Sequence, residues 1–589
     1  MELTPSQPRS SILVPLGTAA LVFAAIAPTL WWQEFDGGSE NLVVATALEM
    51  HREGRWIIPT LQGQDRIAKP PLAAWIAAGA MRRQTLDQIA STDRAVRDSA
   101  YRTLGFEARW PALLTACLAL IAVWDLGRTL AGARAGALAA AVCASSILFL
   151  RYAGIITTDV QLMLWVVLAN ALLARIILHG RRYGLCIAAG AVLGLAFMSK
   201  GPVALVQTVL PAGLFILWRR RANRDRAGAD GRAQAESPSA VGAFVAGLVA
   251  MVLVAAPWFV WVLVQTPGAV DRWIVEVTRS GATDLPADSV FSYLIFIPLF
   301  LPWTGFLVAG AIDLRPRAQT PSAPRDGLLL ALLLLVVPIV TMTLFRDRKD
   351  RYLLPMVGAA AVLAAHGLRL WIDGQLGPRA ARALAWSHWI IVGAMSVGVP
   401  LAGWLYLGRD QGQPWLGPAL GVGGAIVGAL VVLGGIVASR RRPGAMVPVS
   451  VVLMLLTFIL FVHGYSRSDE ARSDMKPLAD QIRAQAARPL VWYVRPDGKR
   501  KMAPLDLAIY LNATVRSAGG EPAEPHPTQP QVVVCFQRGI EGQPEPRLDP
   551  SWRPLPRVGR GKDWLYAFIR PPVVDPCYEP VTRPTSRTD

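Results

Sequence analysis

A small set of charged residues interrupts an otherwise apolar chain, and each lies beside a long hydrophobic run. A charge next to a membrane span is costly unless it is paired or hydrated, so such residues are functional candidates. Carboxylates can accept a proton, whereas lysine and arginine can hold an anion. The candidates are Asp36, Glu40, Lys69, Asp159, Lys200 and the run Arg346–Arg351. The hydrophobic pattern places all of them in loops on one side of a membrane, which predicts a single active site facing one compartment.

Hydrophobic spans must position these residues. The chain of 589 residues is 53% hydrophobic and 17% charged, and runs of about 18 or more apolar residues predict transmembrane helices. The first run, Ser11–Leu30, is too long for the apolar part of a signal peptide and lacks a cleavage site, so we expect it to be retained. About thirteen spans are predicted, at 12–31, 110–127, 134–150, 159–177, 183–198, 202–218, 240–265, 289–311, 327–345, 352–371, 385–407, 416–438 and 446–464.

Arginines flank the loops on the side opposite to the candidate residues. With a cytoplasmic N-terminus every inside loop is basic, as the positive-inside rule requires. The odd number of spans then places the C-terminal segment outside, which is the periplasm if the source is a Gram-negative bacterium. The net charge of +18 therefore follows from membrane topology, and without a recognition motif it does not indicate nucleic-acid binding. The loop Phe345–Tyr352 is also basic although it lies outside, and an anionic ligand is the simplest reason.

Residues 1–465 are predicted to form a transmembrane catalytic domain. Its first outside loop, 32–109, contains a segment typical of an amphipathic helix, Gly38–Arg52, and an apolar segment, Pro70–Met81. Both fit short helices that lie parallel to the bilayer. The predicted fold class is therefore an α-helical polytopic membrane protein.

Residues 466–589 are predicted to form a periplasmic α/β domain with a disordered tail. Polar residues and prolines become more frequent after Tyr465, and the ordered part is expected over about 475–575. A disulfide between Cys535 and Cys577 is possible if this domain is periplasmic. Strands are predicted at Leu490–Val494, Val532–Phe536 and Trp564–Ile569, with a helix at Pro504–Leu511.

Several short motifs occur together in a recognisable order. They are Ser39-Glu40, Ala47–Met50, Gly54–Pro59, Lys69-Pro70-Pro71-Leu72, Thr157-Thr158-Asp159, Ser199–Pro202, Ala256–Trp258 and Arg351–Pro355. Over about residues 10–465, the chain resembles the bacterial GT-C glycosyltransferases related to lipid A aminoarabinose transferase and to protein O-mannosyltransferases. The order and spacing of the motifs are specific, although no single motif is.

The resemblance implies a hexosyl- or pentosyltransferase that uses a sugar on a polyprenyl phosphate, such as undecaprenyl phosphate. Transfer would occur on the outer face of the inner membrane with inversion at the anomeric carbon. The acceptor would be lipid A, another glycolipid, an envelope polymer or a protein hydroxyl. A lipid phosphate is a stable leaving group, so such a site mainly needs cations at the phosphate and a carboxylate for the acceptor proton.

Candidate roles follow from the resemblance together with this chemistry. Glu40, Asp159 and Asp36 are candidates for proton acceptance and sugar orientation. Arginine can contact phosphate oxygens through two donors, and lysine supplies a point charge. The candidate donor-phosphate ligands are Lys69, Lys200, Arg348, Arg351 and Tyr352.

The sequence departs from the family pattern at two places. The family opens its first loop with an acidic pair, usually Asp-Glu, whereas this chain has Ser39-Glu40. Asp36 could replace the missing acid if the loop shifts. The aminoarabinose transferases also carry Glu and His side chains that can bind a divalent cation, but the matching positions are Ala68 and Val277. Because carboxylate or imidazole ligands are needed to hold a divalent cation, we expect no metal cofactor.

Simpler structural explanations remain open for the same residues. Asp159 could cap the helix that follows it, Lys200 could extend from a helix end into water, and Glu40 could be a solvated acid of a first helical turn. The basic loop could form a surface network of its own charges, with Arg348, Lys349 and Arg351 paired to Asp347 and Asp350.

Two other functions remain as alternatives to a transferase. A non-catalytic, lipid-binding relative would explain the lost family acids. A lipid transporter or flippase would be expected to show repeated halves and charges near the membrane midplane. No repeat is evident in the sequence, and the candidate charges gather at one interface.

Overall fold

The fold is taken from a computed structural model of the chain. The structure describes residues 10–35, 38–180, 182–227, 238–278, 289–314, 323–345, 347–407, 416–470, 475–486, 489–494, 503–518, 526, 528–537, 548–560 and 563–572. Asp36, Arg346 and Cys577, together with the predicted disordered tail, lie outside these residues. The expectations that rest on them therefore stay predictions.

The chain divides into two compact units. The membrane unit comprises Met1–Gln33, Ile67–Leu86 and Arg102–Ser468, and the C-terminal unit comprises Glu34–Arg66, Asp87–Tyr101 and Asp469–Asp589. Two segments of the first outside loop thus cluster with the C-terminal residues, which the sequence pattern did not indicate.

The membrane unit is helical, as predicted. Among the residues that the structure describes, eleven helices are long and apolar enough to cross a membrane, or up to thirteen if two bent pairs each count as one span. In the membrane interior helices satisfy all backbone hydrogen bonds within one segment, which explains why apolar runs become helices. The helices over the predicted spans are α1 (Ser10–Ile26), α5 (Arg94–Ala131), α6 (Ala133–Ala144), α7 (Ile147–Ala153), α8 (Thr158–His179), α9 (Tyr183–Lys200), α10 (Val203–Val206), α11 (Val209–Ala227), α12 (Pro238–Gln265), α14 (Phe296–Leu299), α15 (Thr304–Asp313), α16 (Ala323–Met342), α17 (Val357–Ile372), α18 (Pro378–Leu407), α19 (Leu416–Arg441) and α20 (Met446–Glu470).

Further short elements complete this unit. The helix predicted at Pro70–Met81 is confirmed as α3, while its orientation to a bilayer stays a prediction. The remaining short elements are η1 (Ala27–Trp31), α3 (Leu72–Ala80), α4 (Arg83–Ile89), α13 (Ala269–Thr278), η2 (Val290–Ile295), η3 (Asp350–Met356) and η4 (Pro443–Ala445), of which α4 crosses the unit boundary.

Two predicted spans are bent rather than straight. Ala133–Ala144 and Ile147–Ala153 meet at 64°, and Phe291–Leu299 and Thr304–Asp313 meet at 107°. The two breaks touch, because the Trp303 indole donates a 2.9 Å hydrogen bond to the Ser145 hydroxyl. A polar contact of this kind holds the two irregular segments together inside the membrane unit.

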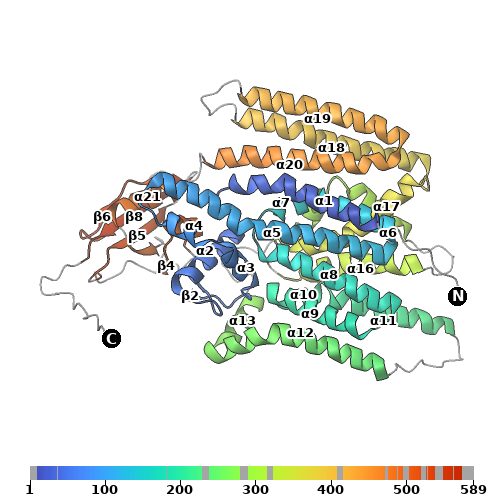
Figure 1. Cartoon of the computed structure of the whole chain (residues 1–589), viewed down its shortest axis with the longest axis horizontal. Helices are drawn as coiled ribbons and strands as arrows, with labels where there is room; N and C mark the ends of the chain where they lie inside the picture. The colour runs from blue at the N-terminus through green and yellow to red at the C-terminus, as the bar shows by residue number, and fades with distance from the viewer. Residues whose placement is uncertain are drawn as a thin grey trace, which may run out of the picture. The chain divides into compact units, whose positions relative to one another are not determined.

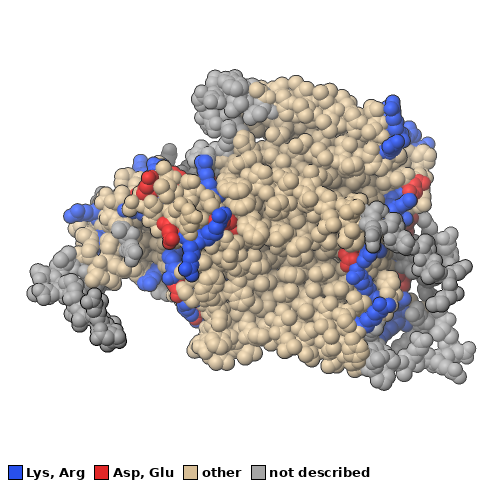
Figure 2. Space-filling view, viewed as in Figure 1, with Lys and Arg blue, Asp and Glu red and all other residues tan. Residues whose placement is uncertain are grey.

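The long helices run side by side (Figure 1) and approach closely where both carry glycine. A Cβ atom on Gly190 of α9 would lie 1.8 Å from the carbonyl oxygen of Gly247 in α12. Only glycine fits such a crossing, as is usual for packed membrane helices. Figure 2 shows a broad area without charged residues over these helices.

The C-terminal unit combines loop segments with an α/β sheet. The loop supplies α2 (Gly38–Glu53) and the hairpin β1 (Thr60–Leu61) and β2 (Gln64–Asp65). Helix α2 confirms the segment predicted at Gly38–Arg52. The other elements are α21 (Met475–Gln485), β3 (Leu490–Val494), α22 (Leu505–Leu511), β4 (Val515–Ala518), β5 (Gln531–Gln537), β6 (Arg553–Pro554), β7 (Val558–Arg560) and β8 (Asp563–Arg570).

The sheet has the strand order β4-β3-β5-β8-β6, with β7 also paired to β8 (Figure 1). Strands β4, β3 and β5 are parallel, and β8 runs antiparallel to β5. The three predicted strands correspond to β3, β5 and β8, and the predicted helix to α22, so the small α/β domain is confirmed. The shorter β4, β6 and β7 and helix α21 were not predicted, because short strands leave little periodicity to detect.

Candidate functional site

Asp159 lies in the first turn of α8, at a point where the helix is already capped. The side chain of Thr157 accepts the capping hydrogen bond from the Val160 amide. The alternative that Asp159 itself caps the helix is therefore wrong. Its carboxylate instead faces other helices, and its side chain is only 3% exposed.

Two cations bind the Asp159 carboxylate. Lys200 Nζ at the end of α9 donates to Oδ1 at 2.5 Å, and Arg351 Nε in η3 lies 3.4 Å from Oδ2. The Lys200 side chain is 8% exposed, so the expectation that it reaches into water is wrong. A buried charge is tolerated only with a partner, and here one carboxylate serves two cations.

Tyr352 completes this cluster through its ring. Lys200 Nζ lies 3.6 Å from the ring centroid, and the Arg351 guanidinium lies 5.3 Å from it. A cation over an aromatic face is stabilised by the ring quadrupole. Tyr352 therefore orients the two cations and leaves its hydroxyl for another partner. We call Asp159, Lys200, Arg351 and Tyr352 the cation cluster.

The Tyr352 hydroxyl donates to Asp347 in the preceding loop at 2.6 Å. Lys349 pairs with the other oxygen of this carboxylate at 3.1 Å. Partial burial disfavours the charged form of Asp347, but the hydrogen bonds from Tyr352 and Lys349 outweigh it and lower the pKa below the usual value. The expectation of a network within the loop is thus confirmed for Lys349 and Asp347.

The two arginines of the expected network, Arg348 and Arg351, do not pair with the loop acids in the same way. Arg351 pairs with Asp159 rather than with a loop acid. Arg348 donates through Nε and Nη2 to the Thr343 carbonyl, at 3.1 and 2.7 Å. These bonds place the Arg348 guanidinium against its own loop, and they do not bring it into the cation cluster.

Asp350 links the start of η3 to α7. It accepts hydrogen bonds of 2.8 Å from the Tyr152 hydroxyl and from the Arg351 amide, and it pairs with Arg151 at 2.8 Å. The sequence pattern did not identify Arg151 and Tyr152 as site residues. Their place in an outside loop, only a few residues before Asp159, was the one signal that could have found them.

Lys69 belongs to the membrane unit and precedes α3. Helix α3 contacts both α8 and α9, and the Lys69 charge acts on Lys200. The Lys69 charge therefore acts on a cluster in which Asp159 already binds two cations. Such an excess of positive charge suits an anion.

Glu40 lies in the C-terminal unit, in the first turn of α2, as expected. It is 3% exposed, so the expectation of a solvated acid is wrong. Asn41 beside it donates a 3.0 Å hydrogen bond to the Phe35 carbonyl, which ties the first turn of the helix to the residues before it.

The residues at the two metal positions of the related family do not fit a divalent cation. Ala68 is exposed and Val277 is apolar, and neither offers an oxygen or nitrogen ligand. Within the described part of the chain, no three His, Cys, Asp or Glu side chains are grouped to hold a metal ion. Metal independence stays a prediction.

Comparisons with known proteins point to one group. The family model described as "Dolichyl-phosphate-mannose-protein mannosyltransferase" matches residues 102–229. An undecaprenyl phosphate-alpha-4-amino-4-deoxy-L-arabinose arabinosyl transferase from Erwinia tasmaniensis is 25% identical over 424 residues, covering 69% of each chain. The enzyme of that name from Aeromonas salmonicida is 24% identical, over 65% of this chain and 70% of its own.

Solved structures agree with these matches. The crystal structure of ArnT from Cupriavidus metallidurans bound to undecaprenyl phosphate has a TM-score of 0.68 at 19% identity, covering 96% of this chain and 98% of its own. The chain has the ArnT fold. It resembles the GT-C transferases of the lipid A aminoarabinose type, as the motifs indicated. The apo form of the same ArnT gives a TM-score of 0.66 at 19% identity, over 93% of this chain and 97% of its own.

Proposed function

We propose that this protein transfers a sugar from a polyprenyl-phosphate donor to an envelope acceptor. The observation that carries this proposal is the shared binding of Asp159 by Lys200 and Arg351, with the Lys69 charge acting on Lys200. One carboxylate does not neutralise both cations that it binds, so the cluster keeps a surplus of positive charge for a phosphate. The relatives named above act on undecaprenyl-phosphate-linked aminoarabinose, which makes this pentose the first donor to test.

In this proposal the cations act on the leaving group. As the bond between the anomeric carbon and the phosphate oxygen breaks, negative charge grows on the phosphate. Lys200, Arg351 and Lys69 stabilise that charge in a site from which bulk water is largely excluded. Attack from the opposite side of the sugar ring then inverts the anomeric carbon.

Glu40 is the proposed proton acceptor for the acceptor group, with Asp36 as the second candidate. Asp159 binds two cations, and these contacts make it an anchor for their side chains. We further propose that the reaction takes place on the outer face of the inner membrane, with the N-terminus in the cytoplasm. No step of the proposal uses a metal ion.

The test is sugar transfer by the purified protein in lipid. Undecaprenyl-phosphate sugars are supplied one at a time with an outer-membrane lipid extract, and both free undecaprenyl phosphate and labelled product are measured. Transfer of label with release of undecaprenyl phosphate is the expected result. Saturable donor binding without release from any donor would instead support the non-catalytic, lipid-binding alternative.

A further inference from the structure

Tyr510 of α22 hydrogen-bonds to the residues that lead into α2, and all of these residues belong to the C-terminal unit. Its hydroxyl donates to Glu34 Oε2 and accepts a 3.2 Å hydrogen bond from the Phe35 amide. The Tyr510 side chain is 2% exposed. A buried hydroxyl with two protein partners fixes both of them, because leaving either unsatisfied would cost free energy.

Glu34 has a second partner within the same C-terminal unit. Lys476 of α21 donates to its other oxygen, Oε1, at 2.5 Å. The same ammonium lies 5.3 Å from the centroid of the Tyr510 ring. Glu34, Lys476 and Tyr510 thus form a closed triangle of buried or partly buried groups, which holds the Glu34 backbone in one place.

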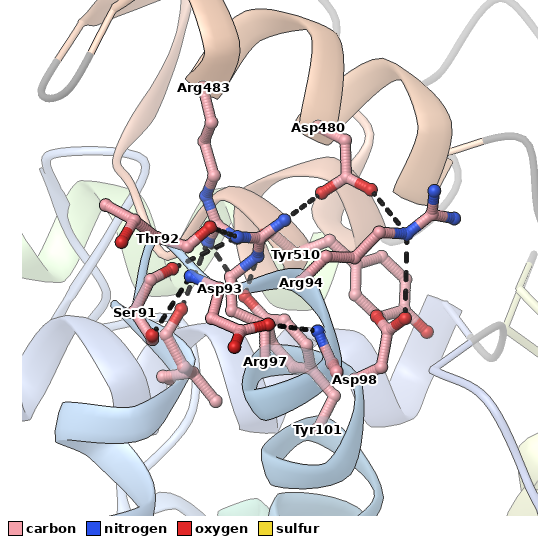
Figure 3. Close-up of polar contacts among 12 residues, drawn as sticks. Ser91, Thr92, Asp93, Arg94, Arg97, Asp98, Tyr101, Asp480, Arg483 and Tyr510 are labelled. Atoms are coloured by element: carbon pink, nitrogen blue, oxygen red, sulfur yellow. Dashed lines mark hydrogen bonds and ion pairs between the residues drawn. The ribbon is translucent and has the colours of Figure 1, made fainter.

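The first residues of α5, near the end of the same loop, contact the same tyrosine. The Tyr101 hydroxyl donates to the Tyr510 carbonyl at 2.7 Å, and the two rings pack edge to face with centroids 5.2 Å apart. Arg483 of α21 donates to the Tyr101 hydroxyl at 3.1 Å. Figure 3 shows Tyr101, Arg483 and Tyr510 converging, with Arg97 paired to Asp480 beside them at 2.5 Å.

The far end of α2 is also held by the residues around α22. Arg52 Nη1 donates to the Asn512 side-chain oxygen at 2.9 Å. Asn512 ends α22 in the left-handed conformation, with a φ of 47°, which asparagine tolerates better than most residues. Helix α2 is therefore anchored at its entrance through Tyr510 and at its end through Asn512.

From these contacts we infer that Tyr510 is a positioning residue for sugar transfer, acting through Glu34 and Phe35 on Glu40. The inference rests on the proposed function of Glu40 as proton acceptor. Phe35 transmits the constraint, because its carbonyl accepts the 3.0 Å hydrogen bond from Asn41, the neighbour of Glu40. This role of Tyr510 would give the C-terminal unit a part in the reaction, because it would hold α2, the helix that carries Glu40.

The main test is Tyr510→Phe, which removes only the hydroxyl. A displacement of about 1 Å at a reacting group can cost about 10²-fold in rate, so we expect kcat to fall by roughly 10- to 100-fold. The KM for the donor should stay unchanged. Tyr566→Phe in β8 is the matched control, since Tyr566 is a buried tyrosine of the same domain, and it should keep wild-type kcat.

A double-mutant cycle links the effect to Glu40. In a Glu40→Gln background, Tyr510→Phe should cause little further loss, because residues that act as one unit are not additive. An equal loss in both backgrounds would overturn the inference. Glu34→Gln keeps the shape of the side chain and should give a smaller loss than Tyr510→Phe, and it serves as the second variant if Tyr510→Phe does not fold.

Hydrogen exchange tests this inference separately from the proposed function, because the exchange rate can be measured whether or not the protein transfers sugar. Faster exchange over residues 38–45 in Tyr510→Phe, with β5 and β8 still protected, is the expected result. Unchanged exchange over 38–45 would overturn the positioning role even if transfer is observed. If the wild-type protein transfers no sugar, the proposed function fails, while the exchange result still tests the role of Tyr510.

Discussion

Lys200 donates a 2.5 Å hydrogen bond to Asp159, although 41 residues separate them in the chain. The pair joins the start of α8 to the end of α9 at a point where both side chains are nearly buried. Burying two charges is costly unless each is well paired. The second contact of Asp159, with Arg351, extends the pair to a third element, so this carboxylate holds the geometry of the whole cation cluster.

Replacing Asp159 tests that role directly. In Asp159→Asn the buried Lys200 and the partly exposed Arg351 lose their counter-charge, and removing one partner of a buried pair costs about 3–5 kcal/mol of stability. We expect the donor phosphate to bind as well as before or more tightly, because more positive charge is available, while turnover falls by ~10²-fold as the cations lose their orientation. Donor titration and transfer rates on the same preparation measure both.

The matched control is Asp326→Asn. Asp326 pairs with Arg219 at 3.4 Å. It lies in the first turn of α16, at the end of that helix opposite to the loop that leads to Arg351, so its replacement should not disturb the cation cluster. It should lose stability without a loss of turnover in the surviving protein. Loss of donor binding in Asp159→Asn alone would contradict the anchoring role and would indicate a direct contact with the donor.

Tyr352 should act through its ring rather than through its hydroxyl. Tyr352→Phe keeps the aromatic face under Lys200, so donor affinity should change by less than about 3-fold. Tyr352→Leu removes the face, and the loss of about 1–2 kcal/mol should weaken donor binding by roughly 5- to 30-fold. Isothermal titration with undecaprenyl phosphate distinguishes the two variants, and equal weakening in both would contradict the cation–π role.

The pKa of Asp347 makes the loop sensitive to acid. Because this pKa is lowered in the folded protein, the ionised carboxylate contributes stability above the ordinary aspartate pKa of about 3.9. That contribution is lost as the pH falls through the lowered pKa. The melting temperature of the wild type should therefore drop faster than that of Asp347→Asn between about pH 5 and pH 3. If the melting temperatures of the two proteins changed with pH in parallel, ionised Asp347 would make no contribution to stability.

Transfer should not depend on a divalent cation, since Ala68 and Val277 offer no ligand. Incubation with EDTA followed by gel filtration is expected to leave the rate within about 2-fold of the untreated protein. An ArnT relative treated in parallel provides a check on the procedure. A loss of activity that Mg²⁺ or Zn²⁺ restores would show that other residues hold a metal ion.

Cysteine labelling tests the proposed orientation. Lys349→Cys should react with a membrane-impermeant maleimide added outside intact spheroplasts, whereas Arg382→Cys should react only after the membrane is opened. Both positions have exposed or partly exposed side chains, so access should limit neither reaction. Labelling of Lys349→Cys only from the cytoplasmic side would place the cation cluster in the wrong compartment for the proposed reaction.

The sequence by itself determined the membrane architecture of this protein. The predicted spans correspond to helices or to bent helix pairs, because the membrane interior forces an apolar run to satisfy its hydrogen bonds locally. The predicted β3, β5, β8 and α22 were likewise found, since each is a compact apolar run. Local composition was also sufficient to place Asp159, Lys200 and Arg351 among the candidate residues.

Only the tertiary structure decided which candidates meet. Asp159 pairs with Lys200 and Arg351 across three elements, while Arg348, three residues before Arg351, donates to the Thr343 carbonyl instead. Tyr510 reaches Glu34 across 476 positions of the chain. Charge patterns report which residues avoid the membrane interior, but pairing depends on how helices cross and where their ends come together. The distances between these side chains are set by packing between segments that are far apart in the sequence, and a sequence pattern does not contain that packing.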